Sequence, residues 1–358
     1  MKIIAMYLPQ YHSFPENDKW WGKGYTEWTA VKRGCPLYKG HRQPKVPKDK
    51  RYYDLVNDGV NTLKWQSELA EKYGLYGFAF YHYYFKGKHL MEKPMEILLS
   101  HPEIKMSYCI AWANETWTRA WYDRSEEILM KQEYGEKADW EAHFQYLLPF
   151  FKDERYIKNN GAPVMMIYRT FDIEKLGEMI DYLRSRAVEE GFTGIFFIGG
   201  KTAGKIEDRE DIKDKIDGWY DFEPGYTLKH GLSPFQTFCY DLSVALRHGI
   251  NIFKKKKLLE RRIPIRWIYS SIEKRSIEAN EYPGIISQWD NTPRRSYKGL
   301  VYTGASPEEF KRMMGVLKKK TAGRKNDYVF LNAWNEWGEG AMIEPTEEEG
   351  YRYLEGLK

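Results

Sequence analysis

Two carboxylates stand close together near the end of the chain, among tryptophans and glycines. Residues 330–340 read FLNAWNEWGEG, so an apolar segment runs directly into Glu336 and Glu339. Carboxylates three residues apart can converge on one substrate where the chain turns, and Gly338 and Gly340 permit a turn. Cleavage of a glycosidic bond needs one carboxyl group to protonate the leaving oxygen and a second to act on the sugar. The segment is therefore predicted to be the catalytic centre of a carbohydrate-active enzyme.

The surroundings of these acids support that interpretation. A single Glu after a strand more often belongs to the first turn of a helix, where the helix dipole favours negative charge. Here Asn, Trp and Glu recur together, and Asn114-Glu115 repeats the pair Asn335-Glu336 after another apolar segment. A general acid must keep its proton near neutral pH, and a partly apolar pocket raises a carboxyl pKa. The tryptophans beside Glu336 and Glu339 fit that demand, with Glu115 as a rival for the acid role.

Polar and aromatic side chains at the ends of other apolar segments are predicted to bind the substrate. Aromatic rings stack on the apolar faces of sugars, and 16% of the chain is Phe, Trp or Tyr. An aromatic-rich core is the alternative for the rings, and His12, Glu27 and His82 could instead order loops or the core. Arg294 and Arg295 could hold an anionic group or lie on the surface. The candidate substrate-binding residues are Gln10, His12, Glu27, Trp28, Tyr81, His82, Trp112, Asn114, Glu115, Trp117, Trp289, Asp290, Asn332, Trp334, Asn335 and Glu344.

Short apolar segments alternate with helical patterns along the chain. Eight strands alternating with helices indicate an α/β protein built as a single (β/α)8 TIM barrel with long loops after the strands. An open doubly wound sheet fits the alternation almost as well, but it needs a glycine-rich phosphate loop, and neither GxGxxG nor GxxxxGK[ST] occurs. The predicted strands are residues 2–7, 76–84, 106–112, 163–168, 194–199, 218–222, 284–289 and 328–334. The predicted helices are residues 54–73, 94–100, 140–151, 173–190 and 306–319.

Two segments interrupt the alternation. Residues 9–50 form a long aromatic-rich loop, and residues 226–283 form a long insertion within what is predicted to be one catalytic domain. Loops of this length are usually functional or have structure of their own. The insertion contains the basic run 254–257 (KKKK), followed by Arg261 and Arg262. This run is predicted to be a solvated helix face, with contact to an anionic polymer or a membrane surface as the alternative.

Composition excludes several classes of protein. The 358 residues are 42% hydrophobic, which is enough for a large core, and the net charge of +5 is too small to indicate a nucleic-acid partner. No apolar stretch approaches the roughly 20 residues of a membrane span, and the first residues lack a signal-peptide pattern. The three cysteines have no metal-like spacing, and there is no HExxH motif or Asp-rich calcium loop. A cytoplasmic protein without metal or other cofactor is predicted, and the oligomeric state stays open.

The strand-end motifs taken together resemble one family. The sequence is similar to the glycosyltransferase WbsX-like proteins, also described as glycoside hydrolase family 99-like proteins, over nearly its whole length. The resemblance is specific for the family and less specific for an activity, because the family is usually described from its place in polysaccharide or O-antigen gene clusters. The motifs that carry it are residues 7–12 (YLPQYH), 24–28 (GYTEW), 80–83 (FYHY), 112–117 (WANETW) and 332–340 (NAWNEWGEG).

The resemblance implies a (β/α)8 barrel and a retaining glycosidase mechanism that needs no metal. The better understood relatives, the family 99 endo-α-mannosidases and endo-α-mannanases, use the substrate 2-hydroxyl as an internal nucleophile and form a 1,2-anhydro sugar. By this resemblance Glu336 is the base on the 2-hydroxyl, and Glu339 is the acid/base on the glycosidic oxygen. The usual retaining scheme differs, because there a carboxylate attacks the sugar. The relatives carry His where this chain has Gly338, so mannose specificity does not carry over.

Three functions are compatible with the sequence, and each takes a carbohydrate as partner. The first is a retaining glycosidase that acts on a bacterial polysaccharide or an O-antigen-type glycan. The second is a glycosyltransferase of lipopolysaccharide, O-antigen or capsule biosynthesis, although the common metal-dependent transferases need an Asp-x-Asp motif and none occurs. The third is a barrel that binds carbohydrate without cleaving it, which would not need several carboxylates at one strand end.

Overall fold

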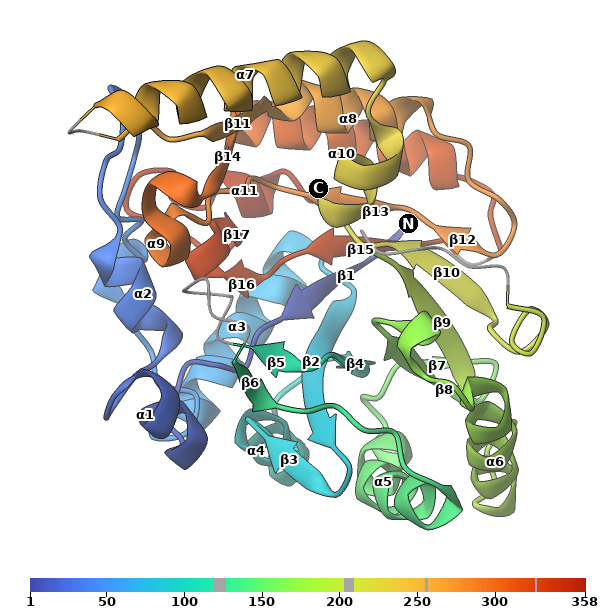
Figure 1. Cartoon of the computed structure of the whole chain (residues 1–358). Coiled ribbons are helices and arrows are strands. Elements are labelled where there is room, and N and C mark those ends of the chain that lie inside the picture. The colour runs from blue at the N-terminus through green and yellow to red at the C-terminus, as the bar shows by residue number, and fades with distance from the viewer. Residues whose placement is uncertain (119–126, 203–208, 255–256, 326) are drawn as a thin grey trace.

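A ring of parallel strands forms the centre of the molecule (Figure 1). The computed structural model describes residues 1–118, 127–202, 209–254, 257–325 and 327–358. The strands of the ring are β1 (Lys2–Tyr7), β2 (Gly77–Phe85), β4 (Tyr108–Trp112), β8 (Ala162–Ile167), β9 (Phe196–Lys201), β10 (Gly218–Asp221), β12 (Glu281–Tyr282), β13 (Gly284–Ile286) and β15 (Tyr328–Asn332). Several of them, such as β4 and β8, are buried at every position, because the barrel interior and the outer helices exclude water from both faces.

The seventh strand of the barrel is interrupted and closes the ring. β12 pairs with β10 on one side, whereas β13 pairs with β15 on the other, and only Pro283 separates the two halves. Proline has no N–H to donate to a neighbouring strand, but the Pro283 carbonyl still accepts from Phe330 N at 3.0 Å. At the seam a Cβ on Gly284 would lie 1.9 Å from the Asp221 carbonyl oxygen, so only glycine allows this approach. With β12 and β13 counted together as one strand, the described residues form a (β/α)8 barrel, and the predicted fold class is confirmed.

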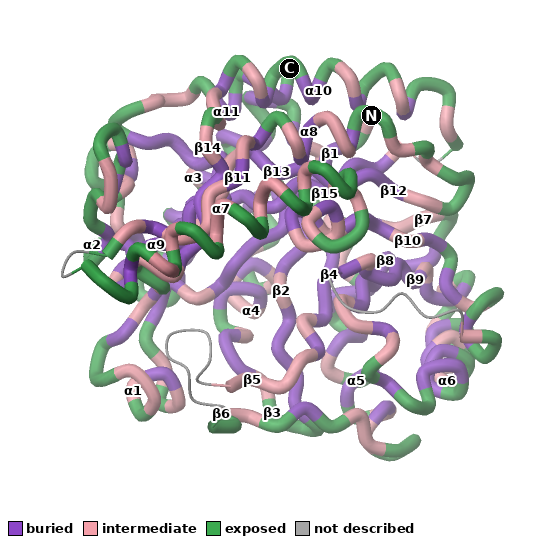
Figure 2. The backbone as a smooth tube through the Cα atoms, turned by 45° about the horizontal axis from the view of Figure 1, so that its top comes forward, coloured by how far each residue is buried: buried purple, intermediate pink, exposed green. Residues whose placement is uncertain are grey.

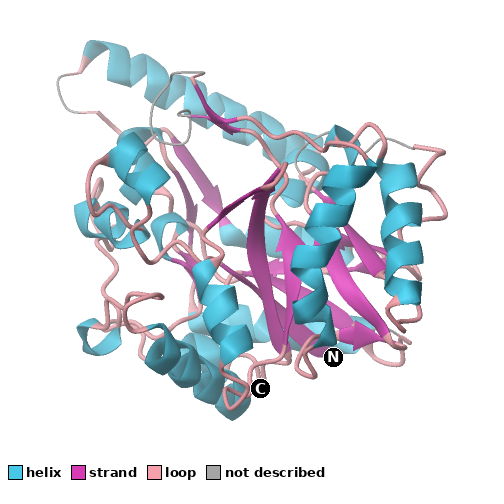
Figure 3. Ribbon diagram, turned by 90° about the horizontal axis from the view of Figure 1, so that it is seen from below, coloured by secondary structure: helices cyan, strands magenta, loops and turns pink. Residues whose placement is uncertain are grey.

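Helices cover the outside of the barrel, as Figures 1 and 3 show. Five of them were expected from the sequence. Ser306 caps the helix that begins at Pro307, since its hydroxyl accepts from Glu309 N at 3.2 Å. Helix α3 begins later than predicted, because the Asp54 side chain binds the backbone N–H groups of the next turn. The helices that follow barrel strands are α3 (Gly59–Tyr73), α4 (Lys93–Ser100), α5 (Lys137–Lys152), α6 (Leu176–Glu189), α8 (Ile265–Lys274), α10 (Pro307–Thr321) and α11 (Arg352–Glu355).

Residues after the strands form the loops that carry the site. The seventh and eighth strands end at Ile286 and Asn332, three and two residues before their predicted ends, because the chain leaves the sheet there. The loop after β1 contains α1 (Pro15–Trp21) and α2 (Glu27–Arg33), and the loop after β13 contains α9 (Thr292–Arg295).

The predicted insertion has a structure of its own. A π-helical turn, η4 (Thr227–Gly231), leads into the long helix α7 (Pro234–Phe253). β11 (Arg261–Pro264) then pairs in parallel with β14 (Leu300–Thr303) to make a small second sheet. The rest of the predicted insertion includes α8, which is an ordinary barrel helix. Residues 255 and 256 of the basic run lie outside the described residues.

One large hydrophobic cluster joins the barrel strands and the helices around them. Figure 2 shows this as a buried centre beneath helices with exposed outer faces. Within the described ranges, no helix is both long enough and apolar enough to cross a membrane.

Candidate active site

The two predicted catalytic acids lie on a tight hairpin after β15, called here the catalytic hairpin. β16 (Asn335–Glu336) pairs antiparallel with β17 (Ala341–Met342), and η6 (Trp337–Glu339) forms one turn of 3-10 helix between them. The turn ends at Gly340, whose φ of +60° favours glycine. The hairpin extends from the carboxyl end of a barrel strand, which is where (β/α)8 enzymes bind their substrates.

One guanidinium group, that of Arg294 in α9, contacts three carboxylates. Its Nη1 lies 2.8 Å from Glu339 Oε1, and its Nη2 lies 3.4 Å from Glu336 Oε2. Its Nε and Nη2 lie 2.9 and 2.8 Å from Oε1 of Glu27, the first residue of α2. The loops after the first, seventh and eighth strands therefore meet at this buried cation. Arg294 was considered for an anionic ligand, but the anions it holds are the protein's own side chains.

The Glu27 carboxylate occupies the space beside Gly338. A Cβ at Gly338 would lie 1.6 Å from Glu27 Oε1 and 2.7 Å from Arg294 Nε. Gly338 is therefore needed for this close approach, and the expectation that it serves the turn is corrected, since Gly340 has that role. The second oxygen of Glu27, Oε2, is buried and has no hydrogen-bond partner among the described residues. A buried polar atom without a partner is costly, so a hydrogen-bond donor of a bound ligand would satisfy it.

Burial raises the pKa of both acids of the catalytic hairpin. For Glu336, loss of water is the main cause and repulsion from Glu339 adds to it, so its pKa stands well above the usual range although Arg294 lowers it. For Glu339, burial again raises the pKa, and Arg294 is the main opposing influence. Arg294 is closer to Glu339, so the free protein favours charge on Glu339 and the proton on Glu336. Paired carboxyl groups with raised pKa values are typical of acid/base catalysis.

Strand β2 presents alternate residues to the two sides of the barrel wall. Tyr81 and Tyr83 lie near the acids, since burial and then the charge of Glu336 raise the pKa of both phenols. His82 lies on the opposite side, with its Nε2 2.9 Å from Nε2 of His143 in α5, and burial lowers its pKa to about 3. His82 is thus a core histidine, which corrects its assignment to the substrate. Tyr83 was missed, although the two-residue period of a strand would have found it.

Glu115, the proposed rival acid, lies at the same end of the barrel. Burial raises its pKa, although Arg169 Nη1 lies 3.4 Å from its Oε2, and its charge raises the pKa of Glu339 in turn. Asn114 holds this loop in place, because its amide donates to Arg169 O at 2.9 Å and its carbonyl accepts from Arg169 N at 2.8 Å. Asn114 therefore positions the loop, while Glu115 belongs with the acids of the site.

Three more side chains at strand ends have polar atoms without partners. Asn332 donates to Glu223 O at 2.7 Å, but its Oδ1 is buried and unpaired within the described part of the chain. The same holds for Nε1 of Trp289 and for the hydroxyl of Tyr220. Asn332 and Trp289 were predicted to bind substrate, and Tyr220 was missed. Polar groups of a bound ligand would pair with such atoms.

Glu344 lies beneath the catalytic hairpin and not on the substrate side. Its Oε1 accepts from Gln66 Nε2 at 2.7 Å and Trp334 Nε1 at 2.8 Å, while its Oε2 accepts from Tyr53 OH at 2.9 Å and Trp337 Nε1 at 2.6 Å. Burial raises its pKa to about 7 against the lowering effect of these bonds. Because both oxygens are occupied and Trp334 is fully buried, the assignment of these two residues to the substrate is corrected. They hold the hairpin.

Other predicted residues also support the site from below. Asn335 exchanges two hydrogen bonds with the backbone of Leu8, at 2.8 and 3.0 Å, and so ties the hairpin to the end of β1. Trp28 donates to Tyr53 O at 2.8 Å, and its ring packs among other aromatic rings. Trp112 donates to a backbone carbonyl of β2 at 3.2 Å and is buried. These three were predicted to bind substrate, but their polar groups are already used inside the core.

The first loop is ordered by two more of the predicted residues. Gln10 donates to Asn17 Oδ1 at 3.2 Å, and His12 Nδ1 lies 3.1 Å from Pro9 O, with its pKa lowered by burial. Neither has a described contact with the two acids, so the loop-ordering alternative fits them better. Trp117 is half-buried and packs its ring against Tyr83, at 5.1 Å between centroids, next to the site.

Asp290 positions the catalytic hairpin through the backbone. Its N–H donates to Glu339 O at 2.7 Å. Its carboxylate accepts from Gln43 Nε2 at 2.7 Å and from Thr292, and it pairs with His41 at 2.7 Å. Burial would raise its pKa, but these hydrogen bonds outweigh it and lower the pKa, so Asp290 stays charged. Its oxygens are occupied, which makes it a positioning residue instead of the predicted substrate ligand.

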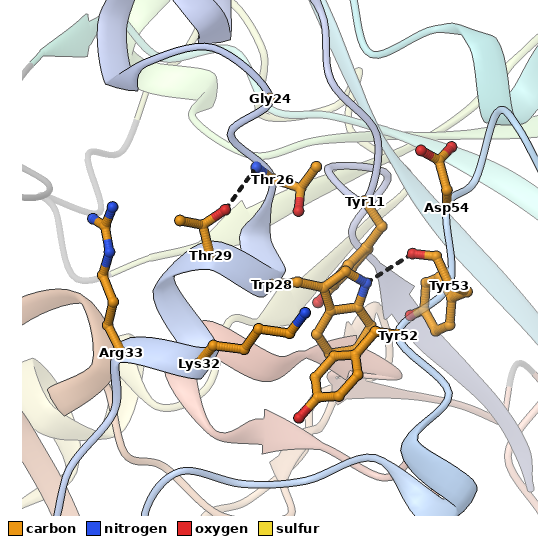
Figure 4. A pocket seen from close by; sticks show the side chains of 10 residues that line it. All are labelled: Tyr11, Gly24, Thr26, Trp28, Thr29, Lys32, Arg33, Tyr52, Tyr53 and Asp54. Carbon is orange, nitrogen blue, oxygen red and sulfur yellow. Dashed lines mark hydrogen bonds between the residues drawn. The ribbon is translucent and has the colours of Figure 1, made fainter.

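An open pocket of about 510 Å³ lies next to Trp28 and does not include the acids (Figure 4). It is lined from the first loop and the segment before α3, and Figure 4 shows Lys32 and Arg33 on one side and Asp54 on the other. Asp54 is the one carboxyl group among its lining residues, whereas the catalytic hairpin carries two with raised pKa values, so the hairpin is the candidate active site. No group of three or more His, Cys, Asp or Glu side chains that could hold a metal ion is found among the described residues.

Comparison with known proteins identifies the family. The model of the family described as glycosyltransferase WbsX matches residues 3–357. The chain belongs to the glycosyltransferase WbsX family. Two WxcX proteins from strains of Xanthomonas campestris, both described as uncharacterized, are 32% identical over 99% of this chain. The chain spans about half the length of these curated relatives, 49% in each case.

Solved structures share the fold over the whole chain. The GH99 endo-alpha-mannosidase from Bacteroides thetaiotaomicron matches with a TM-score of 0.54 and 12% identity, over 99% of this chain and 94% of that one. A protein described as glycoside hydrolase-like matches with a TM-score of 0.57 and 13% identity, over 100% and 92% of the two chains. At this identity the likeness concerns the fold. Family and fold together indicate a carbohydrate-active enzyme.

Proposed function

We propose that this protein is a retaining glycosidase in which Glu336 and Glu339 form the acid/base pair. The observation that carries the proposal is the pair itself: two buried carboxyl groups with raised pKa values, held by one arginine at the carboxyl end of a (β/α)8 barrel. The unpaired oxygen of Glu27, which shares Arg294 with both acids, and that of Asn332 at the end of β15 are suited to sugar hydroxyls.

In the first step, Glu336 takes the proton of the substrate 2-hydroxyl while that oxygen attacks the anomeric carbon. The glycosidic bond breaks, and Glu339 gives its proton to the leaving oxygen. The product is a 1,2-anhydro sugar, with one proton now on Glu336 and none on Glu339. In the second step, Glu339 takes a proton from water as the water oxygen attacks the anomeric carbon, and Glu336 returns its proton to the 2-oxygen. Two inversions give net retention.

The proton must change place for this assignment to operate. In the free protein Arg294 favours charge on Glu339, whereas the first step needs Glu339 protonated. Substrate binding therefore has to lengthen the contact between Arg294 and Glu339, which lets the shared proton move across the pair. The exchanged assignment, with Glu336 as acid, is the alternative that the resting geometry favours.

The proposed substrate is a bacterial polysaccharide or an O-antigen-type glycan. This choice of substrate rests on the family, because the sequence resembles proteins from polysaccharide and O-antigen gene clusters. The proposal names no sugar, since the Glu27 carboxylate fills the space beside Gly338, where the family 99 enzymes that the sequence resembles carry His. The curated relatives are about twice as long, so other parts of those proteins bear on their substrates.

The test uses the wild type with Glu336→Gln and Glu339→Gln on a panel of bacterial polysaccharides and aryl glycosides, without nucleotide sugar. Release of reducing ends by the wild type and its loss in both variants is expected. An aryl glycoside with a strongly acidic phenol needs no protonation, so it restores activity only to the variant that lacks the acid. Glu178→Gln, an exposed glutamate on α6, is the matched control. Full activity in either site variant would remove that residue from the mechanism.

A glycosyltransferase is the second candidate, and the description of the matching family favours it. It predicts tight binding of a nucleotide sugar and growth of a glycan chain. Calorimetry with a set of nucleotide sugars tests this directly. Binding that disappears in Glu339→Gln, together with no release of reducing ends, would replace the glycosidase by a transferase.

A further inference from the structure

Helix α7 turns an apolar face to the solvent. Six of its large exposed side chains recur every three or four residues, which places them in one stripe along the helix, whereas the exposed Ile252 lies outside the stripe. Such a stripe normally faces a core, and a contiguous apolar surface of this kind marks a docking site. The stripe consists of Phe235, Phe238, Leu242, Leu246, Ile250 and Phe253, which are 73, 63, 48, 61, 39 and 88% exposed.

The other side of α7 is fixed to the protein, so the stripe cannot simply roll inward. Arg247 donates to Glu260 O at 3.0 Å, and the Asn251 amide donates to Leu258 O at 2.8 Å and accepts from Leu258 N at 2.6 Å. Tyr240 packs against the main hydrophobic cluster. In Figure 1, α7 lies along the edge of the molecule, and in Figure 2 exposed and half-buried stretches alternate along it.

Positive charge surrounds this stripe. Lys229 precedes α7, Lys254 follows Phe253 directly, and Lys257 lies just beyond, and all three lysines are exposed. Residues 226–254 and 257–275 together hold nine Lys or Arg against three Asp or Glu, whereas the whole chain has 56 against 51. A helix with bulky apolar residues on one face and lysines at its ends is suited to the interface of an anionic bilayer, where the apolar side enters between the lipids and the cations meet the phosphates.

We propose that α7 binds the protein to the surface of a membrane rich in anionic lipid. The helix lies in the plane of the interface and does not span it, in agreement with the absence of a spanning helix in the described ranges. Aromatic and aliphatic side chains of the stripe supply the apolar contact, and Lys229, Lys254 and Lys257 supply the charge. A glycan carried on a lipid would then be met at the surface where it is anchored.

The test is co-sedimentation of the whole chain with vesicles of phosphatidylglycerol and phosphatidylethanolamine, compared with vesicles of phosphatidylcholine. Binding to the anionic vesicles that weakens in high salt is expected. Phe238→Glu/Leu246→Glu should lower the partition coefficient more than a hundredfold, at about tenfold or more for each lost apolar side chain. Lys254→Ala/Lys257→Ala should lower it about 25-fold, at about fivefold for each lysine.

Two control variants keep the test specific. Val188→Glu adds a charge at another exposed apolar residue, on α6, and Lys318→Ala/Lys319→Ala removes two exposed lysines of α10. Both should bind vesicles as the wild type does, and circular dichroism checks that every variant is folded. Equal binding of the wild type and the α7 variants would overturn the proposal. Equal affinity for both kinds of vesicle would also overturn it. A dimer in ultracentrifugation that Phe238→Glu/Leu246→Glu dissociates would overturn it as well, since a second copy would then cover the stripe.

Discussion

Replacing Gly338 by alanine places a methyl group where the Glu27 carboxylate now lies. The added Cβ would be 1.6 Å from Glu27 Oε1 and 2.7 Å from Arg294 Nε. The backbone of the catalytic hairpin is held by β17 and by Asn335, so it cannot yield easily. The Glu27 side chain must move instead, and its contacts with Arg294, at 2.8 and 2.9 Å, are lost.

The expected cost follows from that broken ion pair. Loss of one partner of a buried salt bridge destabilises a protein by about 3–5 kcal/mol. Unfolding entropies of about 2.1 cal/mol/K per residue give about 0.75 kcal/mol/K for a chain of this length, so Tm should fall by about 4–7 °C. Gly315→Ala is the matched control, because Gly315 lies in α10 with no atom near its Cβ position. That change should be neutral or stabilise by up to about 1 kcal/mol.

Urea unfolding and calorimetry of both variants measure the difference. The same Gly338→Ala change is then made in a Glu27→Ala background, where no carboxylate stands in the way. We expect its cost to drop below about 1 kcal/mol there, because the two residues are coupled through direct contact. Wild-type stability for Gly338→Ala, or an equal cost with and without Glu27, would refute the assignment of this space to the Glu27 carboxylate.

Three further predictions concern the buried charges. Because the pKa of Glu336 is raised in the folded protein, its contribution to stability is present at low pH and is lost as pH rises through the folded-state pKa. In urea unfolding, Glu336→Gln should therefore be more stable than wild type at pH 8 and equal to it near pH 4. A variant less stable than wild type at pH 8 would contradict this. Arg294→Gln removes the cation that lowers the pKa of Glu336 and Glu339, so the pKa of both acids should rise and the bell-shaped pH profile of kcat/KM should move to higher pH. An unchanged pH profile would contradict the described contacts of Arg294 with the two acids. Glu344→Leu leaves four buried donors without an acceptor, so it should lower the free energy of unfolding by more than about 4 kcal/mol in thermal unfolding. Glu355→Leu on the surface should change that free energy little. Similar losses for both variants would count against the described network.

The barrel could be predicted from the sequence because its strands are short, apolar and separated by helical periods. All eight predicted strands are present, and the errors lie at their ends. The prediction ran the seventh strand to residue 289, but the chain leaves the sheet after Ile286, where the polar residues Ser287 and Gln288 follow. Helix α7 was not predicted, although its apolar residues have helical spacing, because residues 226–283 were treated as one long insertion.

The acids of the catalytic hairpin could be predicted because they follow a strand directly, whereas the contacts that define their surroundings could not. Arg294 and Glu27 are 267 residues apart, and no local pattern links them. Composition also cannot separate side chains that line a site from those that support it. Glu344 and Trp334 belong to the same motif as Glu336, yet they form the buried support of the hairpin.

The most direct test of the account is to follow the oxygen of water into the product. The wild type, Glu336→Gln and Glu339→Gln are incubated in H2¹⁸O with a glycan from the panel and no nucleotide sugar, and products are read by mass spectrometry and proton NMR. The account predicts one ¹⁸O at each new reducing end, first formed with the anomeric configuration of the substrate, in the wild type alone. Unchanged labelling in both variants, or products that form only when a nucleotide sugar is supplied and carry no label, would contradict it.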